Sequence, residues 1–154
     1  MRVYDAFIKI SGLNSARTLL YVTVASNKIV RLLHTSVTDA SNETNEQLEV
    51  VWQKITTVGT PTKTDITPTK HDQGDAASGA TVAGNVTASE PTYTANVVFG
   101  QQGFPSLTGY LWPPTPLPLV AYRVFTVGDS WGLRLLSTPT AFDAIILATW
   151  GEEG

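Results

Sequence analysis

The chain has 154 residues and no cysteine, which excludes disulfides, zinc–thiolate sites, iron–sulfur clusters and thiol nucleophiles. Charged residues make up 15% of the sequence, the formal net charge is −3, and no run of Lys or Arg could neutralise a phosphate backbone. The N-terminal segment lacks the apolar core of a secretory signal, and no apolar run approaches the ~20 residues that span a bilayer. We expect one domain over residues 1–154, with neither a nucleic-acid nor a membrane partner.

Short apolar runs separated by Asn, Asp, Gly, Ser and Pro predict strands and turns, so the expected fold class is all-β. In the run at 47–57, for example, Leu48, Val50 and Trp52 share one face, which is the period of two of a half-buried strand. The segments 25–28 and 127–130 are predicted to be hairpin turns. About eight strands are expected, at 4–10, 18–25, 28–37, 47–57, 93–100, 119–127, 131–137 and 143–150.

The segment 57–92 is rich in Thr, Gly, Ala, Asp and Pro and has no large apolar cluster, so we predict one long Thr/Gly/Pro-rich loop. A second, shorter loop is expected at 38–48. The long loop is either a solvated excursion or an arm that becomes ordered on a neighbouring subunit. In the second case its isolated apolar residues, Ile66, Val82 and Val86, are the predicted contacts.

The segment 109–118 contains four prolines, which remove four backbone donors and predict an edge strand or a connector. Its aromatic residues have two possible roles. Tyr110 and Trp112 either cover one end of the β-fold or, together with Pro113 and Pro114, form an exposed contact with another subunit.

The residues that could support catalysis are few. His34 lies within an apolar strand, which is typical of a structural histidine, and His71 lies beside Asp72 and Asp75 on a Gly-rich segment unsuited to a rigid metal site. Neither histidine has an obvious serine partner, and the sequence has no phosphate-binding glycine motif. We expect no catalytic residues, no metal and no cofactor, and predict that the protein is not an enzyme. Carboxylates paired across strands stay open as an alternative.

Several motifs follow one another along the whole chain. They are Arg2-Val3-Tyr4-Asp5, Leu19-Leu20-Tyr21-Val22-Thr23, Gly59-Thr60-Pro61-Thr62, Phe99-Gly100-Gln101-Gln102-Gly103, Gly109-Tyr110-Leu111-Trp112-Pro113-Pro114-Thr115-Pro116, Leu133-Arg134-Leu135 and Glu152-Glu153-Gly154. This order resembles a family of small jelly-roll proteins of tailed phages and prophages, some of which decorate or cement the phage head. Leu117 departs from the family, which has an acidic residue there. Gly151 departs as well, since an aromatic residue of the family directly precedes the acidic pair.

The resemblance implies a jelly-roll-like sandwich of two antiparallel sheets that forms a homo-oligomer such as a trimer. It further implies a virion protein, made in the host cytoplasm, that bridges neighbouring subunits of the major capsid protein on the outer capsid surface. The alternative is a receptor- or carbohydrate-binding module of a phage tail or virion, with Tyr93, Tyr110, Trp112 and Trp131 available to stack on sugars. If 57–92 is the contact arm, deletion of 65–85 leaves a folded protein that no longer binds capsids.

Overall fold

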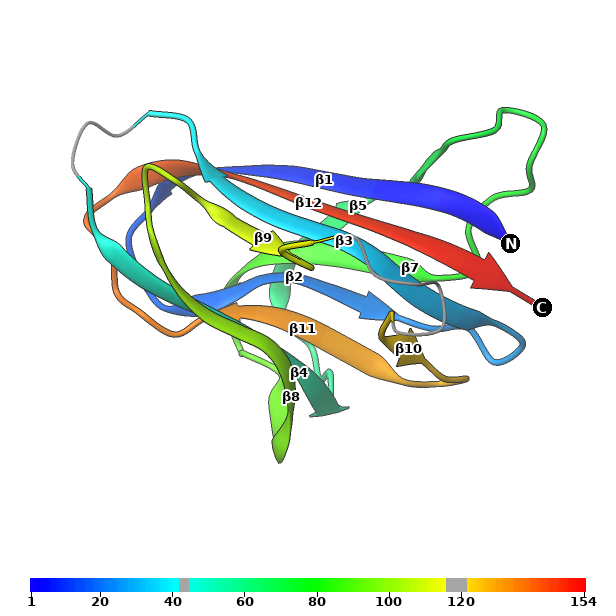
Figure 1. Cartoon of the computed structure of the whole chain (residues 1–154). Coiled ribbons are helices and arrows are strands. Elements are labelled where there is room, and N and C mark those ends of the chain that lie inside the picture. The colour runs from blue at the N-terminus through cyan, green and yellow to red at the C-terminus, as the bar shows by residue number, and fades with distance from the viewer. Residues whose placement is uncertain (42–44, 116–121) are drawn as a thin grey trace.

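The protein is a sandwich of two β-sheets (Figure 1). A computed structural model describes residues 1–41, 45–115 and 122–154, and within them twelve strands form two six-stranded antiparallel sheets. The all-β sandwich predicted from the sequence is therefore confirmed. Sheet A contains Arg2–Leu13 (β1), Ile29–Asp39 (β3), Thr69–Lys70 (β6), Tyr110–Trp112 (β9), Val124–Phe125 (β10) and Phe142–Glu153 (β12). Sheet B contains Arg17–Thr23 (β2), Gln47–Thr57 (β4), Thr62–Ile66 (β5), Thr81–Ala88 (β7), Thr92–Pro105 (β8) and Ser130–Leu135 (β11).

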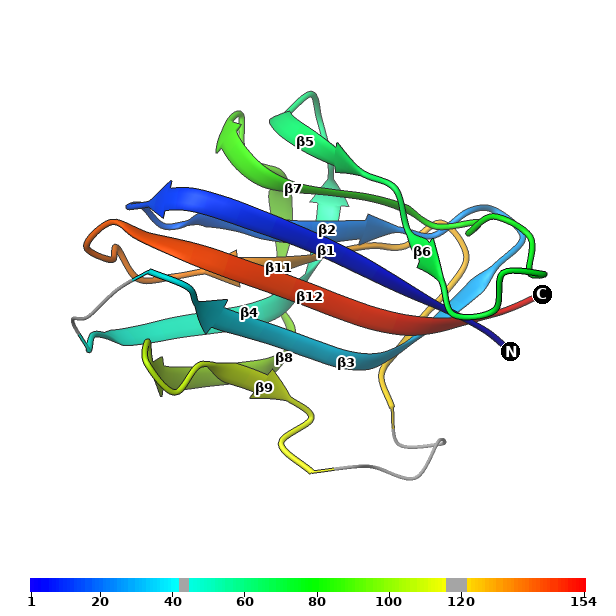
Figure 2. The same ribbon diagram turned by 90° about the horizontal axis from the view of Figure 1, so that it is seen from above.

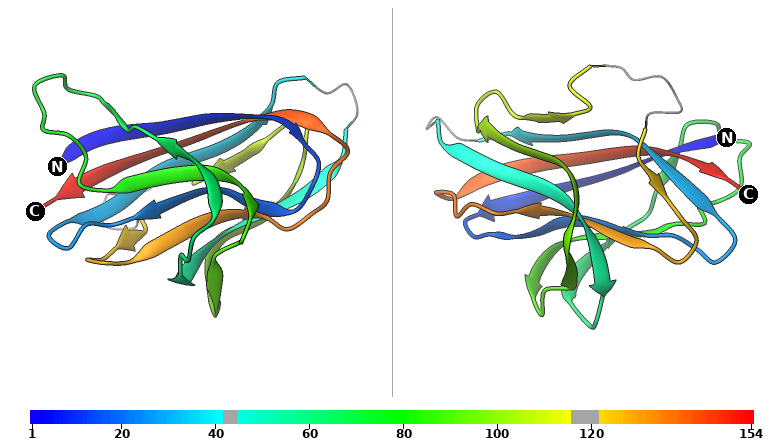
Figure 3. Two further views of the ribbon diagram at one scale, coloured as in Figure 1. Left: turned by 180° about the vertical axis from the view of Figure 1, so that it is seen from behind. Right: turned by 60° about the horizontal axis from the view of Figure 1, so that its bottom comes forward.

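The strand order is jelly-roll-like, because the chain crosses repeatedly between the sheets. β1 to β4 alternate between sheet A and sheet B, and the last two long strands return to central positions. β12 lies between β1 and β3 in sheet A, and β11 lies between β2 and β4 in sheet B, as Figure 2 and Figure 3 show. Strands from opposite ends of the chain are thus neighbours throughout the sandwich.

The main core fills the space between the sheets. Along β1, Tyr4, Ala6, Ile8 and Ile10 are buried while the residues between them face outward, which is the alternation expected for a strand covered on one face. The inward faces of the other long strands do the same, and bury Trp52 and Trp150 completely. A polar bond also crosses the core, where the indole N–H of Trp52 donates to the hydroxyl of Thr35 at 3.2 Å.

The prediction of a single long loop at 57–92 is wrong, because this segment contains β5, β6 and β7. β7 pairs with β2, and β5 pairs with β7, so that Ile66 lies opposite Val82. Threonine has a high strand propensity, and these strands need few large apolar residues because two of them are short and lie at sheet edges. Deletion of 65–85 would remove β6 and most of β7, an inner strand of sheet B, so we now expect this variant not to fold.

The other strand predictions agree with the structure in part. Three strands, β5, β6 and β7, were not predicted from the sequence, and β9 lies in the segment expected to be an edge strand or a connector, so the expected number of eight is too low. In the predicted strand 119–127 the structure describes 122–127, of which Val124–Phe125 form β10, while 119–121 lie outside the described residues. In the predicted loop 38–48, residues 38–39 belong to β3 and residues 47–48 belong to β4, while 42–44 lie outside the described residues.

Both predicted hairpin turns are real turns but do not form hairpins. The amide of Lys28 donates to the carbonyl of Ala25 at 3.2 Å, and the amide of Asp129 donates to the carbonyl of Thr126 at 2.9 Å. Each turn, however, joins a strand of one sheet to a strand of the other, β2 to β3 and β10 to β11. The same turn residues therefore form the corners of the sandwich.

Candidate contact surface

The predicted arm residues belong mostly to the interior of this chain. Val82 and Val86 are 4% and 1% exposed, because β7 is an inner strand of sheet B. Ile66, on the edge strand β5, is half-buried and packs against the main core. The side chains of Val82 and Val86 are thus not accessible to a partner, which corrects their assignment as contact residues.

The described part of the proline-rich segment, 109–115, lies at the edge of sheet A as predicted, and 116–118 lie outside the described residues. β9 pairs with β3 and turns Tyr110 inward, where the residue is 1% exposed and its hydroxyl donates to the carbonyl of Gly100 at 2.8 Å. Tyr110 therefore joins the edges of the two sheets and is not a surface contact. Trp112 is half-buried and meets Phe99 edge to face, with ring centroids 5.1 Å apart.

The two prolines that follow Trp112 have different surroundings. Pro113 is buried and Pro114 is exposed. Both line a surface hollow of about 310 Å³, together with Leu33, Leu111 and the half-buried His34. Burial lowers the pKa of His34 below its usual range, although the nearby Asp5 acts in the opposite direction. Of the predicted contact residues, Trp112, Pro113 and Pro114 thus lie together at this edge.

A second hollow, of about 420 Å³, lies beside Trp112. Its lining consists of Trp112, Phe99, Tyr122, Arg123 and Val124. The guanidinium of Arg123 lies 5.2 Å from the ring centroid of Phe99 and 5.1 Å from that of Trp131. Aromatic faces beside a fixed cation are suited to stacking on a flat polar ligand such as a sugar.

An apolar row crosses the outer face of sheet A, the face that is turned to the viewer in Figure 2. Phe7 on β1 lies opposite Leu147 on β12, Leu147 lies opposite Ser36 on β3, and Ser36 lies opposite Leu111 on β9. Phe7 and Leu111 are 58% and 44% exposed. Such an exposed apolar stretch, bordered by polar residues, is typical of a protein contact surface. We call Phe7, Leu147, Ser36 and Leu111 the apolar row.

Charged residues border the apolar row on its two long sides. On one side, Asp5 accepts a hydrogen bond from the Thr149 hydroxyl at 2.5 Å and contacts His71 at 2.8 Å. On the other side, Lys9 forms an ion pair with Asp143 at 3.2 Å. The side chains of Asp5 and Lys9 remain 33% and 50% exposed, so both are accessible to a molecule placed on the row.

The outer face of sheet B, by contrast, is covered by the chain itself. Tyr93 lies across β11. The guanidinium of Arg134 is 4.2 Å from the ring centroid of Tyr93, and the hydroxyl of Thr18 is 2.5 Å from the hydroxyl of Tyr93. Tyr93 also packs against a second buried cluster formed by Tyr21, Ile55, Ala83 and Val86. Burial raises the pKa of Tyr93 to about 12. Sheet A therefore carries the more accessible apolar face.

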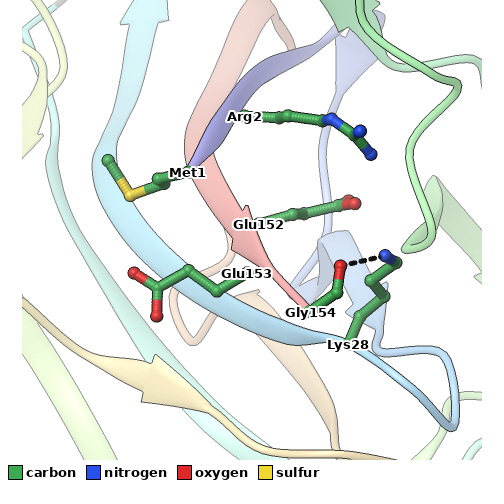
Figure 4. Close-up of a pocket in the computed structure, with 6 residues that line it drawn as sticks. All are labelled: Met1, Arg2, Lys28, Glu152, Glu153 and Gly154. Carbon is green, nitrogen blue, oxygen red and sulfur yellow. Dashed lines mark hydrogen bonds between the residues drawn. The ribbon is translucent and has the colours of Figure 1, made fainter.

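The two acidic residues near the C-terminus do not form a carboxylate pair. Figure 4 shows the side chains of Glu152 and Glu153 pointing to opposite sides of β12, in a pocket of about 300 Å³ that Met1, Arg2 and Lys28 also line. Glu153 is paired with Arg31 at 3.7 Å. Glu152 is buried and accepts hydrogen bonds from the 78–80 segment and from Trp150. It is therefore a structural anchor.

The remaining chemical predictions can be placed on the fold. His71 contacts Asp5 of β1 and not the neighbouring Asp72 and Asp75 that the sequence suggested as companions. In the part of the chain that the structure describes, no three His, Cys, Asp or Glu residues form a group that could hold a metal ion. The same residues include no helix long and apolar enough to cross a membrane.

The apolar row was missed by the sequence analysis. Phe7 stands between Asp5 and Lys9 at an outward position of its strand, and an apolar residue there is the one signal in the sequence that could have indicated it. Leu147 sits in an apolar run in which inward and outward positions look alike. The pairing of the two residues depends on the β1–β12 register.

Comparison with known proteins identifies no relative of this chain. No family model matches the sequence, and no curated protein and no solved structure matches it either. The phage head-protein family that the motifs resemble therefore stays a prediction, and the all-β sandwich itself is what the structure establishes.

Proposed function

We propose that this protein is a structural virion protein that decorates and stabilises a tailed-phage capsid through contacts between protein surfaces. The observation that carries the proposal is the apolar row on the outer face of sheet A, which leaves Phe7 and Leu111 exposed on one subunit. Covering this row removes apolar surface from water, at about 25 cal/mol per Å². The motif order along the chain agrees with the same function.

A rigid sandwich suits a protein that bridges neighbours and resists internal pressure. Tyr110 and Gly100 join the sheets along one side, and the chain passes directly from β5 in sheet B to β6 in sheet A along the other. On a capsid, many copies of such a unit add their individually modest contacts to the stability of the whole particle. The proposed partner is the major capsid protein, and the proposed location is the outer capsid surface.

Purified capsids that lack this protein provide the test. The purified chain is mixed with them and the capsids are pelleted by centrifugation. We expect the chain to pellet with the capsids, to saturate at a fixed number of copies per particle, and to occur at that number in purified virions. A chain that stays in the supernatant and is absent from virions would refute the proposal.

A second candidate function is binding of a carbohydrate receptor, and the hollow between Trp112 and Arg123 favours it. Of the four aromatic residues that the sequence suggested for sugar stacking, only Trp112 lines this hollow. Tyr110 and Trp131 are buried, and Tyr93 packs on sheet B. A glycan array tests this function: binding that is lost in Trp112→Ala would support it, and an array without hits would exclude it for the glycans tested.

A further inference from the structure

We propose that a second copy of this chain packs on the outer face of sheet A, around a two-fold axis that runs across the strands above the apolar row. The inference rests on the proposed function: it names a second copy of the chain as the neighbour that covers the apolar row, which leaves other surfaces of the pair for the capsid. In this arrangement Phe7 and Leu147 of one copy meet the same residues of the other, as in any isologous contact. Two sheets that pack face to face lie ~10 Å apart with their strands roughly aligned.

The charges beside the apolar row select this axis. On β1, Asp5 and Lys9 stand at equal distances on either side of Phe7, and all three face outward. Rotation about an axis across the strands reverses the strand direction, so Lys9 of each copy comes to lie over Asp5 of the other. An axis along the strands above β1 would instead place Asp5 over Asp5 and Lys9 over Lys9, and one above β12 would place Asp5 over His34 and Lys9 over Thr38. Lys9 therefore meets Asp5 only in the first arrangement.

The residues next to these charges are compatible with the same axis. Ile145 lies opposite Lys9 within sheet A, and Thr149 lies opposite Asp5. In the two-fold pair, Ile145 of one copy faces Thr149 of the other, whose hydroxyl is already bonded to Asp5 and leaves its methyl group for the apolar contact. Asp5 keeps its contacts with Thr149 and His71, and Lys9 keeps its ion pair with Asp143, while the exposed parts of the Asp5 and Lys9 side chains face the other copy.

The size of the face agrees with a specific dimer. β1, β12 and β3 are 11 or 12 residues long and lie side by side. At ~3.3 Å per residue and ~4.8 Å between strands, they present a surface of roughly 35 by 15 Å. Two such surfaces bury about 1,000 Å² in total, which reaches the lower limit of specific interfaces. We therefore expect the two copies to form a dimer of moderate affinity.

Sedimentation velocity of the purified chain over a range of concentrations, in the absence of capsids, tests this arrangement. We expect a reversible association to twice the mass of one chain. A chain that stays monomeric at all concentrations would overturn the proposal. So would a mass of three chains, because an isologous two-fold contact closes on two copies.

Charge reversal tests the axis. Lys9→Glu places a carboxylate against Asp5 of the other copy in each of the two symmetric contacts, and reversing these two exposed pairs is expected to raise the dimer Kd by about tenfold or more. Asp5→Lys combined with Lys9→Glu restores the opposite charges and is expected to return the Kd to within about threefold of the original. An unchanged Kd for Lys9→Glu, or no recovery in the double variant, would overturn the arrangement.

Matched controls separate the face from general effects. Lys54→Glu makes the same charge change at a lysine that is also paired with an aspartate, Asp129, but lies on sheet B, and we expect no change in the Kd. Phe7→Ser removes a side chain that is 58% exposed and should abolish the dimer, whereas Val127→Ser, at a turn residue that is 51% exposed, should not. Circular dichroism confirms that each variant is folded. An equal loss in both members of either control pair would overturn the proposal.

The outcome for the dimer is independent of the outcome for the capsid. A monomeric chain that still pellets with capsids, and loses this binding in Phe7→Ser, would show that the capsid covers the apolar row; the dimer would then be wrong and the proposed function would stand. A dimer with the expected response to Lys9→Glu that binds no capsid would support the inference and refute the proposed function.

Discussion

Replacing Glu152 by glutamine is expected to destabilise the fold, because this buried carboxylate holds the 78–80 segment against β12. The backbone amides of Gly79 and Ala80 donate to it at 2.9 and 3.2 Å, and the indole N–H of Trp150 donates at 3.0 Å. The hydroxyl of Ser78 donates to it as well. Three of these four partners are N–H groups that can only donate, so an NH₂ group in place of one oxygen faces at least one donor and loses that hydrogen bond.

The expected loss in Glu152→Gln is about 2–3 kcal/mol in the free energy of unfolding, since a hydrogen bond to a charged group contributes ~1.5–3 kcal/mol and a buried donor without a partner costs a similar amount. For a chain of this size the loss corresponds to a fall of roughly 4–12 °C in Tm. Urea unfolding followed by tryptophan fluorescence measures it. Hydrogen exchange should also show faster exchange at the amides of Gly79 and Ala80.

The effect of Glu152 depends on pH with a defined sign. Burial alone would raise the pKa of Glu152, but the hydrogen bonds from Ser78, Trp150, Gly79 and Ala80 outweigh it and hold the pKa below its usual range. A carboxyl whose pKa is lowered in the folded state stabilises the fold above its unfolded pKa of ~4.3, and this contribution is lost as the pH falls through the folded pKa. The difference between the wild type and Glu152→Gln should therefore shrink in acid.

Glu153→Gln is the matched control. The Glu153 side chain is 41% exposed and paired with Arg31 at 3.7 Å, so we expect a change of about 0–1 kcal/mol. Equal effects of the two substitutions, or a Glu152→Gln effect that is independent of pH between neutral and strongly acidic solution, would refute the role assigned to Glu152.

Three further predictions concern the aromatic residues that join or cover the sheets. Gly100→Ala places a Cβ 2.8 Å from the Tyr110 hydroxyl, at a residue with φ of +60°. It should lower the free energy of unfolding by about 1–3 kcal/mol more than Gly128→Ala, where φ is +76° but the surrounding space is open. Equal losses for the two variants in urea unfolding would contradict the steric argument. Tyr110→Phe should cost about 1 kcal/mol in the same assay, because it leaves the Gly100 carbonyl without its donor; an unchanged stability would argue against the bond. Burial raises the pKa of Tyr93 to about 12, so the stability it contributes is present below the unfolded pKa of ~10 and is lost as the pH rises toward 12. An alkaline titration of tyrosinate absorbance in the wild type and in Tyr93→Phe measures this ionisation. If the absorbance of the two folded proteins already differs near pH 10, the raised pKa of Tyr93 is contradicted.

Local patterns in the sequence predicted most of the long strands. The alternation at Leu48, Val50 and Trp52 recurs in β4, where all three are buried. Such a pattern depends only on the period of two of a strand, so it can be recognised without knowing what the strand packs against. Strands rich in Thr and Gly were missed, because β5 has no run of large apolar residues and is held by its pairing with β7.

The candidate site was predictable only in part. The edge position of Trp112, Pro113 and Pro114 follows from the prolines themselves, since a residue without an amide donor cannot lie in a central strand. The burial of Val82 and Tyr110 could not be predicted, because it depends on strands that are distant in the sequence. Val82, an isolated apolar residue in a polar segment, and Tyr110, in a proline-rich segment, are both core residues.

The fold class, the absence of thiol side chains and the position of most long strands follow from composition and from the alternation of side chains, because both are local properties of the chain. Which strands are neighbours, and hence which outward residues share a row, depends on how distant segments pair in the folded chain. Phe7 and Leu147 lie near opposite ends of the chain and meet because β1 pairs with β12. The contact surface proposed here exists through that pairing, which no local pattern encodes.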